Sequence, residues 1–298
     1  MKIAIIGSNS FLAGYIIKQL TKPEYNLYLF GRTNSMEDNF DFCLFDLPEI
    51  HPEFTELLKF DAIIYCAGAG IQSNLKQSKG IIFELNAMYP IKLFNGLIEK
   101  KFTGKFISFG SYFEIGDSTK ATEFREKHLL NSRLTVPNDY CISKRIFSRF
   151  IDSVNCSLSY IHLVLPNIYG KNENPLRIIP SVIESIRTKT PLTFSAGTQV
   201  RQYLHAGDIA QLVENYLKGD FESGIYNITY PEHIQVKQLV EIIYDQMGVK
   251  EEFSKVLFGQ KNRSDSKMQY LLLDDNKARN ELNWNPKIDI IKGIQSYF

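Results

Sequence analysis

The sequence has few cysteines, no excess of charge of either sign and no long apolar run, and each absence excludes a class of protein. The formal net charge is +1, without a basic or an acidic block, which gives no basis for binding nucleic acid or an anionic membrane. The cysteines are scattered, with neither a close pair nor zinc-ligand spacing, which predicts reduced thiols: Cys43, Cys66, Cys141 and Cys156. We therefore expect a cytoplasmic protein that holds any anionic ligand with local groups.

Membrane insertion and metal catalysis are also not expected. The apolar run at residues 3–6 breaks at Gly7, well short of a signal-peptide core, and no later stretch approaches the length of a membrane span. The histidines share no metal-ligand spacing with one another or with the cysteines, so we assign no metal site. What the chain does have is 298 residues, 44% of them hydrophobic, enough for a large core and a second lobe.

Short runs rich in Ile, Val and Phe alternate with longer segments of helical period, a pattern typical of parallel strands joined by crossover helices. Strands are predicted at residues 3–7, 27–30, 42–45, 62–67, 105–109 and 159–165. Helices are predicted after Phe11 and at about residues 85–100, 138–152, 236–247 and 276–282, with Asn138 or Asp139 as a cap. The fold class is therefore α/β, a doubly wound parallel sheet of the Rossmann type.

After Pro166 the rhythm changes, and loops with glycine and proline separate shorter elements. This change predicts a smaller, mainly C-terminal substrate lobe whose segments are interleaved with returns to the first. We assign residues 1–166 plus about 196–222 to a dinucleotide-binding domain, and about 167–195 plus 223–298 to the smaller lobe.

The first predicted strand ends in a turn of small residues that opens a helix. Such a turn presents backbone N–H groups and a helix N-terminus to a pyrophosphate, which makes Gly7, Ser10, Phe11 and Leu12 candidate cofactor-binding residues. Taken alone, the segment also fits an ordinary turn between a strand and a helix.

The ends of the next strands carry the other candidate cofactor contacts. Arg32 follows the second strand, where an NAD-selective site would place an acidic residue, so NADP (NADPH) is favoured over NAD; a solvated loop charge is the alternative. Further candidates follow the third and fourth strands, where a plain turn is again the alternative: Asp46, Leu47, Cys66, Ala67 and Gly68.

Tyr140 and Lys144 are four residues apart, hence on one face of the predicted helix. A tyrosine with a pKa near 10 is a poor acid-base group at neutral pH unless a fixed cation stabilises its phenolate, and Lys144 can supply that charge while contacting the nicotinamide ribose. Ser111, near the end of the fifth strand, offers a hydroxyl that can polarise a reacting oxygen. These three residues form the predicted catalytic set, although such a pair also occurs by chance on surface helices.

Over nearly its whole length the chain resembles an extended short-chain dehydrogenase/reductase of the nucleotide-sugar epimerase/dehydratase kind. The turn at Gly7 resembles the family's G-x-x-G-x-x-G, Ser111 its catalytic Ser or Thr, and residues 140–144 its Y-x-x-x-K. Asn86 falls where the family keeps a structural or relay asparagine. Residues 163–170 are similar to L-R-x-x-N-V-Y-G, and residues 191–210 to the segment that ends in R-D-(aromatic)-x-H-V-D-D-V-A.

The resemblance implies a nucleotide-diphosphate sugar as the substrate. Asn167 would then contact the sugar nucleotide, Arg201 its diphosphate, and Arg263 would be a second anion clamp. The remaining predicted substrate-binding residues, beside Ser111, are Tyr112, Arg177 and Phe194, the last where a base could lie. Departures from the family pattern include Ser10 and Ala13 in place of glycines and Gly207 in place of an aspartate.

Among the family's reactions, the residues favour reduction. Tyr112 and Phe113 stand where a dehydratase would show an Asp-Glu pair, and Arg32 suggests NADPH as a consumed reductant. The chain looks like bacterial 4-reductases of the CDP-abequose synthase type, which act on nucleotide-linked 4-keto-6-deoxyhexoses in deoxysugar and O-antigen biosynthesis. An NAD-retaining 4-epimerase and a non-catalytic NADP-binding regulator are the alternatives. The resemblance also suggests a homodimer.

Overall fold

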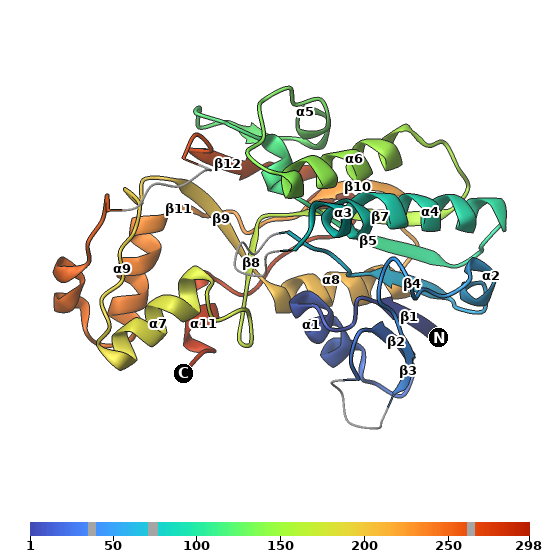
Figure 1. The fold of residues 1–298 in the computed structure, drawn as a ribbon, viewed down its shortest axis with the longest axis horizontal. Helices are drawn as coiled ribbons and strands as arrows, with labels where there is room; N and C mark the ends of the chain where they lie inside the picture. The colour runs from blue at the N-terminus through green and yellow to red at the C-terminus, as the bar shows by residue number, and fades with distance from the viewer. Residues whose placement is uncertain (35–39, 71–76, 261–265) are drawn as a thin grey trace.

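A sheet of seven parallel strands forms the centre of the larger part of the molecule (Figure 1). The computed structural model describes residues 1–34, 40–70, 77–260 and 266–298, and in these ranges the strand order is β10-β7-β5-β4-β1-β2-β3. The order reverses between β1 and β4, so the sheet is doubly wound as predicted. The strands are β1 (Lys2–Ile6), β2 (Asn26–Gly31), β3 (Asp41–Leu44), β4 (Ala62–Tyr65), β5 (Lys105–Ser111), β7 (Ser159–Leu165) and β10 (Gly224–Asn227).

Helices cover both faces of this sheet because its strands are apolar on both sides. Ile3 and Ile5 of β1 pack under α1 (Phe11–Leu20) and α8 (Ala206–Lys218). The alternate residues Ala4 and Ile6 belong to the opposite cluster, which includes α4 (Tyr89–Glu99) and α6 (Asp139–Ser153). The short helices α2 (Phe54–Leu57) and α3 (Lys79–Phe83) lie on the face of α4, and Figure 1 shows the two helix layers above and below the strands.

The predicted helix at about residues 85–100 is divided in the structure. A π-helical turn spans Glu84–Met88, and α4 follows with Pro90 in its first turn. Proline has no N–H to donate to the preceding turn, which agrees with a change of helical pitch at this point. The predicted cap of the next long helix is confirmed, since the side chain of Asn138 accepts a hydrogen bond from the N–H of Cys141 at 3.0 Å.

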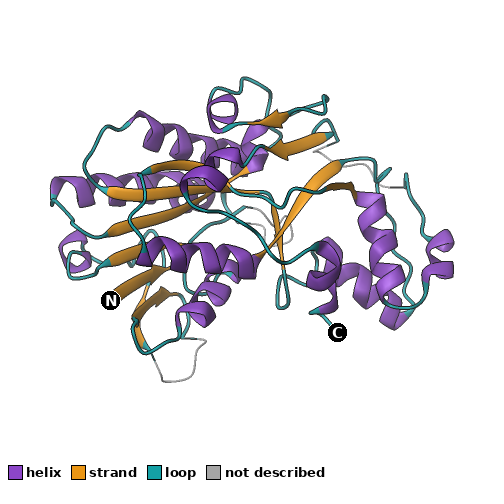
Figure 2. Ribbon diagram, turned by 180° about the vertical axis from the view of Figure 1, so that it is seen from behind, coloured by secondary structure: helices purple, strands orange, loops and turns teal. Residues whose placement is uncertain are grey.

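A smaller sheet and a cluster of helices lie beside the carboxyl ends of the large sheet (Figure 2). The strand order of the smaller sheet is β11-β9-β12-β6, and β8 pairs with β9. The bounds of these strands are β6 (Glu123–Phe124), β8 (Asn167–Tyr169), β9 (Val200–His205), β11 (His233–Gln235) and β12 (Tyr270–Leu273). The third hydrophobic cluster packs α7 (Ile178–Thr188), α9 (Val236–Gln246) and α11 (Ile290–Gln295) together. The remaining elements are α5 (Glu126–Leu130), α10 (Asn276–Glu281) and 3-10 turns at Tyr112–Ile115 and Lys250–Lys255.

Three strands depart from the predicted division of the chain, because β6 and β9 come from ranges assigned to the dinucleotide-binding domain but belong to the smaller sheet, and β10 belongs to the large one. β10 pairs with β7 and is therefore an edge strand of the large sheet, although the sequence places residues 223–298 in the smaller lobe. Four residues beside polar loops give too little pattern to identify an edge strand. The residue bounds of the two lobes stay a prediction.

None of the helices in the described residues combines the length and apolar character that crossing a bilayer requires. Over the same ranges, no group of three or more His, Cys, Asp or Glu side chains is placed to hold a metal ion.

Candidate active site

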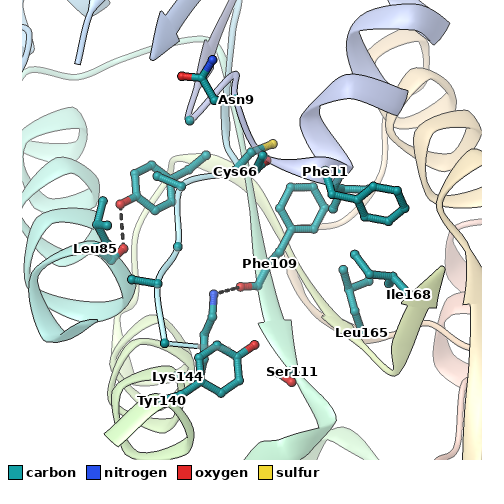
Figure 3. Close-up of a pocket in the computed structure, with 18 of the residues that line it drawn as sticks. Asn9, Phe11, Cys66, Leu85, Phe109, Ser111, Tyr140, Lys144, Leu165 and Ile168 are labelled. Carbon is teal, nitrogen blue, oxygen red and sulfur yellow. Dashed lines mark hydrogen bonds between the residues drawn. The ribbon is translucent and has the colours of Figure 1, made fainter. Parts of the chain in front are cut away.

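A cavity of about 520 Å³ lies at the carboxyl ends of β1, β2, β4 and β5 and extends to β8 and the start of α7. This volume is within the range of small-molecule and cofactor sites. The predicted residues that line it are Gly7, Ser10, Phe11, Leu12, Arg32, Asp46, Leu47, Cys66, Ala67, Gly68, Ser111, Tyr140, Lys144, Asn167 and Arg177. Figure 3 shows Asn9, Cys66 and Phe11 toward one end of this cavity, and Ser111, Tyr140 and Lys144 at the other.

At the first end, the turn after β1 packs closely against the backbone of the segment that follows β4. Gly7 has φ +85°, and a Cβ there would lie 2.4 Å from the backbone N of Ala67. The Ser10 hydroxyl caps α1 by accepting from the N–H of Ala13 at 3.2 Å, so serine replaces the family's glycine with a helix cap. Nothing lies within 4 Å of a Cβ at Gly14, where the structure does not require glycine.

Asn9 ties this turn to the segment that carries Arg32. Its Oδ1 accepts from the N–H groups of Arg32 at 2.8 Å and Thr33 at 3.3 Å, and its Nδ2 donates to the carbonyl oxygen of Thr33 at 2.8 Å. Gly31 leaves room for this contact, because a Cβ there would lie 2.4 Å from Asn9 Oδ1. Asn9 was not predicted, since an asparagine in a turn gives no sequence signal of a partner 23 residues away.

At the other end, β5 and α6 bring the three predicted catalytic residues together. Ser111 is the last residue of β5, and Tyr140 and Lys144 lie one turn apart on α6. The Lys144 ammonium donates to the carbonyl oxygen of Phe109 at 2.9 Å, which links the helix to the strand (Figure 3). The Tyr140 hydroxyl lies beside Ser111 in the same view.

Burial controls the protonation of this end of the cavity. It raises the pKa of Tyr140 above its ordinary value near 10, while the Ser111 hydroxyl and the Arg177 guanidinium act in the opposite direction. Burial also lowers the pKa of Lys144 to about 8, and the Glu114 carboxylate partly opposes this by raising the same pKa. The sequence-based account gave Lys144 the task of lowering the Tyr140 pKa; in this structure burial dominates, and the phenol holds its proton at neutral pH.

Glu114 is a further residue of this region that was not predicted. It is fully buried, and its Oε1 accepts from the Ser111 N–H at 2.7 Å in a capping box that opens the 3-10 turn. It is not among the residues that line the cavity. The Ser-x-x-Glu spacing of residues 111–114 is a sequence signal that could have identified this contact.

Two predicted substrate contacts lie away from the cavity. Tyr112 is fully buried in the core, and it is Phe113, the next residue, that lines the cavity, because the chain turns after β5. Phe194 packs in the third cluster, where its ring stacks on Phe258 at 5.3 Å. Neither Tyr112 nor Phe194 lines the cavity.

Arg201 is also placed differently from the prediction. It is 4% exposed, and its guanidinium donates to the carbonyl oxygens of Val200, Met268 and Gln269 at 2.6–3.2 Å. These bonds join β9 to the segment that enters β12, and Arg201 is not in the cavity lining. Arg263, the second predicted clamp, lies outside the described residues.

Asn86 serves a structural purpose in this structure. Its Nδ2 donates to the carbonyl oxygen of Ala69 at 2.8 Å and to Ser143 Oγ at 3.0 Å, and its Oδ1 accepts from the N–H of Ala69 at 3.0 Å. The amide thereby fixes the strand-end segment that lines the cavity against α6.

Known proteins with this fold resemble the chain along most of its length. It is 22% identical over 309 residues to a putative UDP-glucose 4-epimerase of Methanocaldococcus jannaschii, covering 98% of this chain and 96% of that protein. It is 23% identical to CDP-abequose synthase of Salmonella muenchen, covering 99% and 96%.

Solved structures agree on the fold. The dTDP-glucose 4,6-dehydratase DesIV of Streptomyces venezuelae, solved with NAD and TYD bound, superposes with a TM-score of 0.82 at 18% identity, covering 100% of this chain and 97% of that one. The family model for NAD dependent epimerases and dehydratases matches residues 3–229. This match includes the turn after β1 as well as Ser111, Tyr140 and Lys144, and the chain belongs to the NAD dependent epimerase/dehydratase family.

Proposed function

We propose that this enzyme uses NADPH to reduce the C4 keto group of a nucleotide-linked 4-keto-6-deoxy or 3,6-dideoxy hexose, a step of deoxysugar biosynthesis. The observation that carries the proposal is one continuous cavity, with a glycine turn and Arg32 toward one end and Ser111, Tyr140 and Lys144 at the other. A cofactor fits the first end, because the turn after β1 and the first residues of α1 line the cavity there, and a helix N-terminus favours a bound phosphate.

The nicotinamide, when bound, supplies the hydride for the reaction. Tyr140 donates the proton to the C4 oxygen, and a pKa raised by burial keeps that proton on the phenol until it is needed. Ser111 donates a hydrogen bond to the same oxygen and orients the carbonyl. Lys144 stabilises the phenolate that remains after proton transfer.

Two observations favour reduction over the family's other reactions. Arg32 lines the cavity and suits NADPH, a reductant that is consumed, whereas an epimerase keeps its NAD bound. Dehydration needs acidic groups beside Ser111; Phe113 lines the cavity there, and the Glu114 carboxylate does not. Similarity to a putative UDP-glucose 4-epimerase keeps an NAD-retaining 4-epimerase as the second candidate.

The cofactor preference depends on Arg32. Four charged residues line the cavity within the described part of the chain, and they are Arg32, Asp46, Lys144 and Arg177. Arg32 follows β2, where its guanidinium suits the 2′-phosphate of NADPH. We expect Arg32→Glu to weaken NADPH binding and to leave NADH binding unchanged or stronger, as measured by fluorescence titration; equal effects on the two cofactors would contradict the assignment.

On the substrate side, Asn167 and Arg177 line the cavity and are the groups we assign to the sugar nucleotide. Arg201 would have to leave three carbonyl oxygens to reach a diphosphate, so we give the cationic contact to Arg177.

For the assembly we propose a homodimer. Exposed apolar side chains lie on α6 and the π-helical turn before α4, namely Met88, Ile142 and Ile146, which are 44%, 39% and 38% exposed. A second copy packed on this face would cover them.

Tyr140→Phe tests the chemistry, because it removes the proton donor and leaves the cavity's shape unchanged. The assay follows NADPH oxidation with CDP-, dTDP-, GDP- and UDP-linked 4-keto-6-deoxyhexoses, and NMR identifies the product. We expect turnover to fall by at least about 100-fold with unchanged NADPH binding. Near-normal turnover of the variant would refute the role of Tyr140.

The wild-type protein decides among the candidate functions. No oxidation of NADPH, together with a nicotinamide that stays bound through purification, would favour the epimerase. Binding of NADPH without turnover of any sugar nucleotide would favour a non-catalytic regulator.

A further inference from the structure

Arg177 stands at the boundary between the cavity and the smaller lobe. It is the residue before α7, it lines the cavity, and its side chain is 24% exposed. Its Nε forms an ion pair with Oε2 of Glu173 at 2.8 Å. A guanidinium has five N–H donors, and this pair uses the one on Nε, so the planar fork of the terminal amino groups remains for bidentate contact with an anion.

Glu173 is unusual because its carboxylate is buried, with the residue 5% exposed. Burial raises the pKa of Glu173, and the Arg177 guanidinium lowers it. A carboxylate in such a place is costly unless it is paired and hydrogen-bonded. The second partner comes from beyond α11, since the Tyr297 hydroxyl donates to Glu173 Oε1.

A second hydrogen bond fixes the direction in which the Tyr297 hydroxyl donates its proton. Its hydroxyl accepts from the N–H of Gly170 at 2.8 Å, so its single proton points at Glu173. The segment between these residues is fixed at other points as well: the N–H of Glu173 donates to the carbonyl oxygen of Gly170 at 3.1 Å, and Tyr15 of α1 donates to that of Lys171 at 3.1 Å. The phenol therefore orients the carboxylate, and the carboxylate orients the guanidinium.

We propose that Glu173 and Tyr297 are positioning residues that hold Arg177 in place to bind the diphosphate of the sugar nucleotide. The proposal rests on the proposed function in taking a sugar nucleotide as the occupant of this end of the cavity. An unrestrained arginine side chain loses rotamer freedom when it binds a phosphate, and a guanidinium already fixed by Glu173 loses less. The expected consequence is tighter binding of the diphosphate with little change in the chemical step.

The test uses Tyr297→Phe and Glu173→Gln, with Tyr169→Phe as the matched control. Tyr169 also has a buried hydroxyl next to α11, but this hydroxyl donates to the carbonyl oxygen of Asp289 at 3.1 Å and not to Glu173. Calorimetry measures the Kd of CDP, dTDP, GDP and UDP, and a separate titration measures the Kd of NADPH. We expect Tyr297→Phe and Glu173→Gln to weaken the best-bound nucleoside diphosphate about tenfold and the control to weaken it less than twofold.

A double-mutant cycle separates positioning from general destabilisation. If Tyr297 acts through Arg177, Tyr297→Phe has no further effect on the nucleoside diphosphate in an Arg177→Ala background. An equal tenfold loss in that background would overturn the proposal, as would loss of NADPH binding in Tyr297→Phe or failure of all four nucleoside diphosphates to bind the wild type. These measurements need no turnover. If the proposed reduction is wrong, NADPH oxidation will be absent while the double-mutant cycle for nucleoside diphosphate binding still gives the expected result.

Discussion

His162 of β7 gives a quantitative prediction about the contacts that link β5 to α6. It is fully buried, and its ring nitrogens contact Ser108 Oγ on β5 and Ser148 Oγ on α6, each at 2.9 Å. Burial, with a smaller effect of the Lys144 cation, lowers its pKa to about 3 from 6.5. The folded protein therefore holds this imidazole neutral, whereas the unfolded chain binds a proton below pH 6.5.

The sign of the effect follows from proton binding. Because the unfolded state binds more protons between pH 6.5 and pH 3, the free energy of unfolding falls as the pH falls through this window. A shift of this size removes about 2 kcal/mol between pH 8 and pH 5. His205, whose pKa burial also lowers, acts in the same direction, and Glu214, with a pKa lowered to about 2, contributes only below pH 4.5.

The variant His162→Gln isolates the contribution. Glutamine can still hydrogen-bond to Ser108 and Ser148, but it does not titrate. Urea unfolding, followed by circular dichroism, measures the free energy of unfolding at pH 8 and at pH 5. The fall in this free energy from pH 8 to pH 5 should be larger in the wild type than in the variant by about 2 kcal/mol. An equal loss in the two proteins would refute the assignment of a neutral, buried His162.

Three other predictions concern the cavity and its support. Gly7→Ala should abolish NADPH binding, because residue 7 has φ +85° and its Cβ would lie 2.4 Å from the backbone N of Ala67. Gly14→Ala is the control: nothing lies within 4 Å of its Cβ, so NADPH binding should be kept, and thermal unfolding should show a gain in stability of up to about 1 kcal/mol. Glu114→Gln removes the carboxylate that raises the Lys144 pKa, so the alkaline limb of kcat/KM, expected near pH 8, should move to lower pH; an unchanged limb would contradict this. Arg201→Gln should cost at least about 2 kcal/mol in urea unfolding, since buried carbonyl oxygens lose their donors, and should change nucleoside diphosphate affinity less than Arg177→Ala does.

The parts of the site that were predictable depend on local geometry. A helix brings residues four apart to one face, so the pairing of Tyr140 with Lys144 is already present in the spacing. The ends of parallel strands meet at one edge of a sheet, so the turns at Gly7, Arg32 and Cys66 had to lie near one another once the strands were identified.

Two of the contacts that were missed join residues far apart in the chain. Tyr297 meets Glu173 across 124 residues, and Arg201 meets Met268 across 67, and no local pattern encodes either distance. Tyr112 and Phe113 show a smaller failure of the same kind, because the direction of a turn after β5 decides which of two adjacent rings enters the cavity.

The sequence by itself determined the alternating α/β order, the turn after β1 and the Tyr140–Lys144 pair, because each follows from a local pattern of a few residues. Tertiary structure alone decided which cation faces the cavity. Arg177 and Arg201 are equally charged in the sequence, yet one is paired with a buried carboxylate at the cavity and the other with carbonyl oxygens between two strands. Packing decides this, since a buried guanidinium binds whatever acceptors the fold places around it.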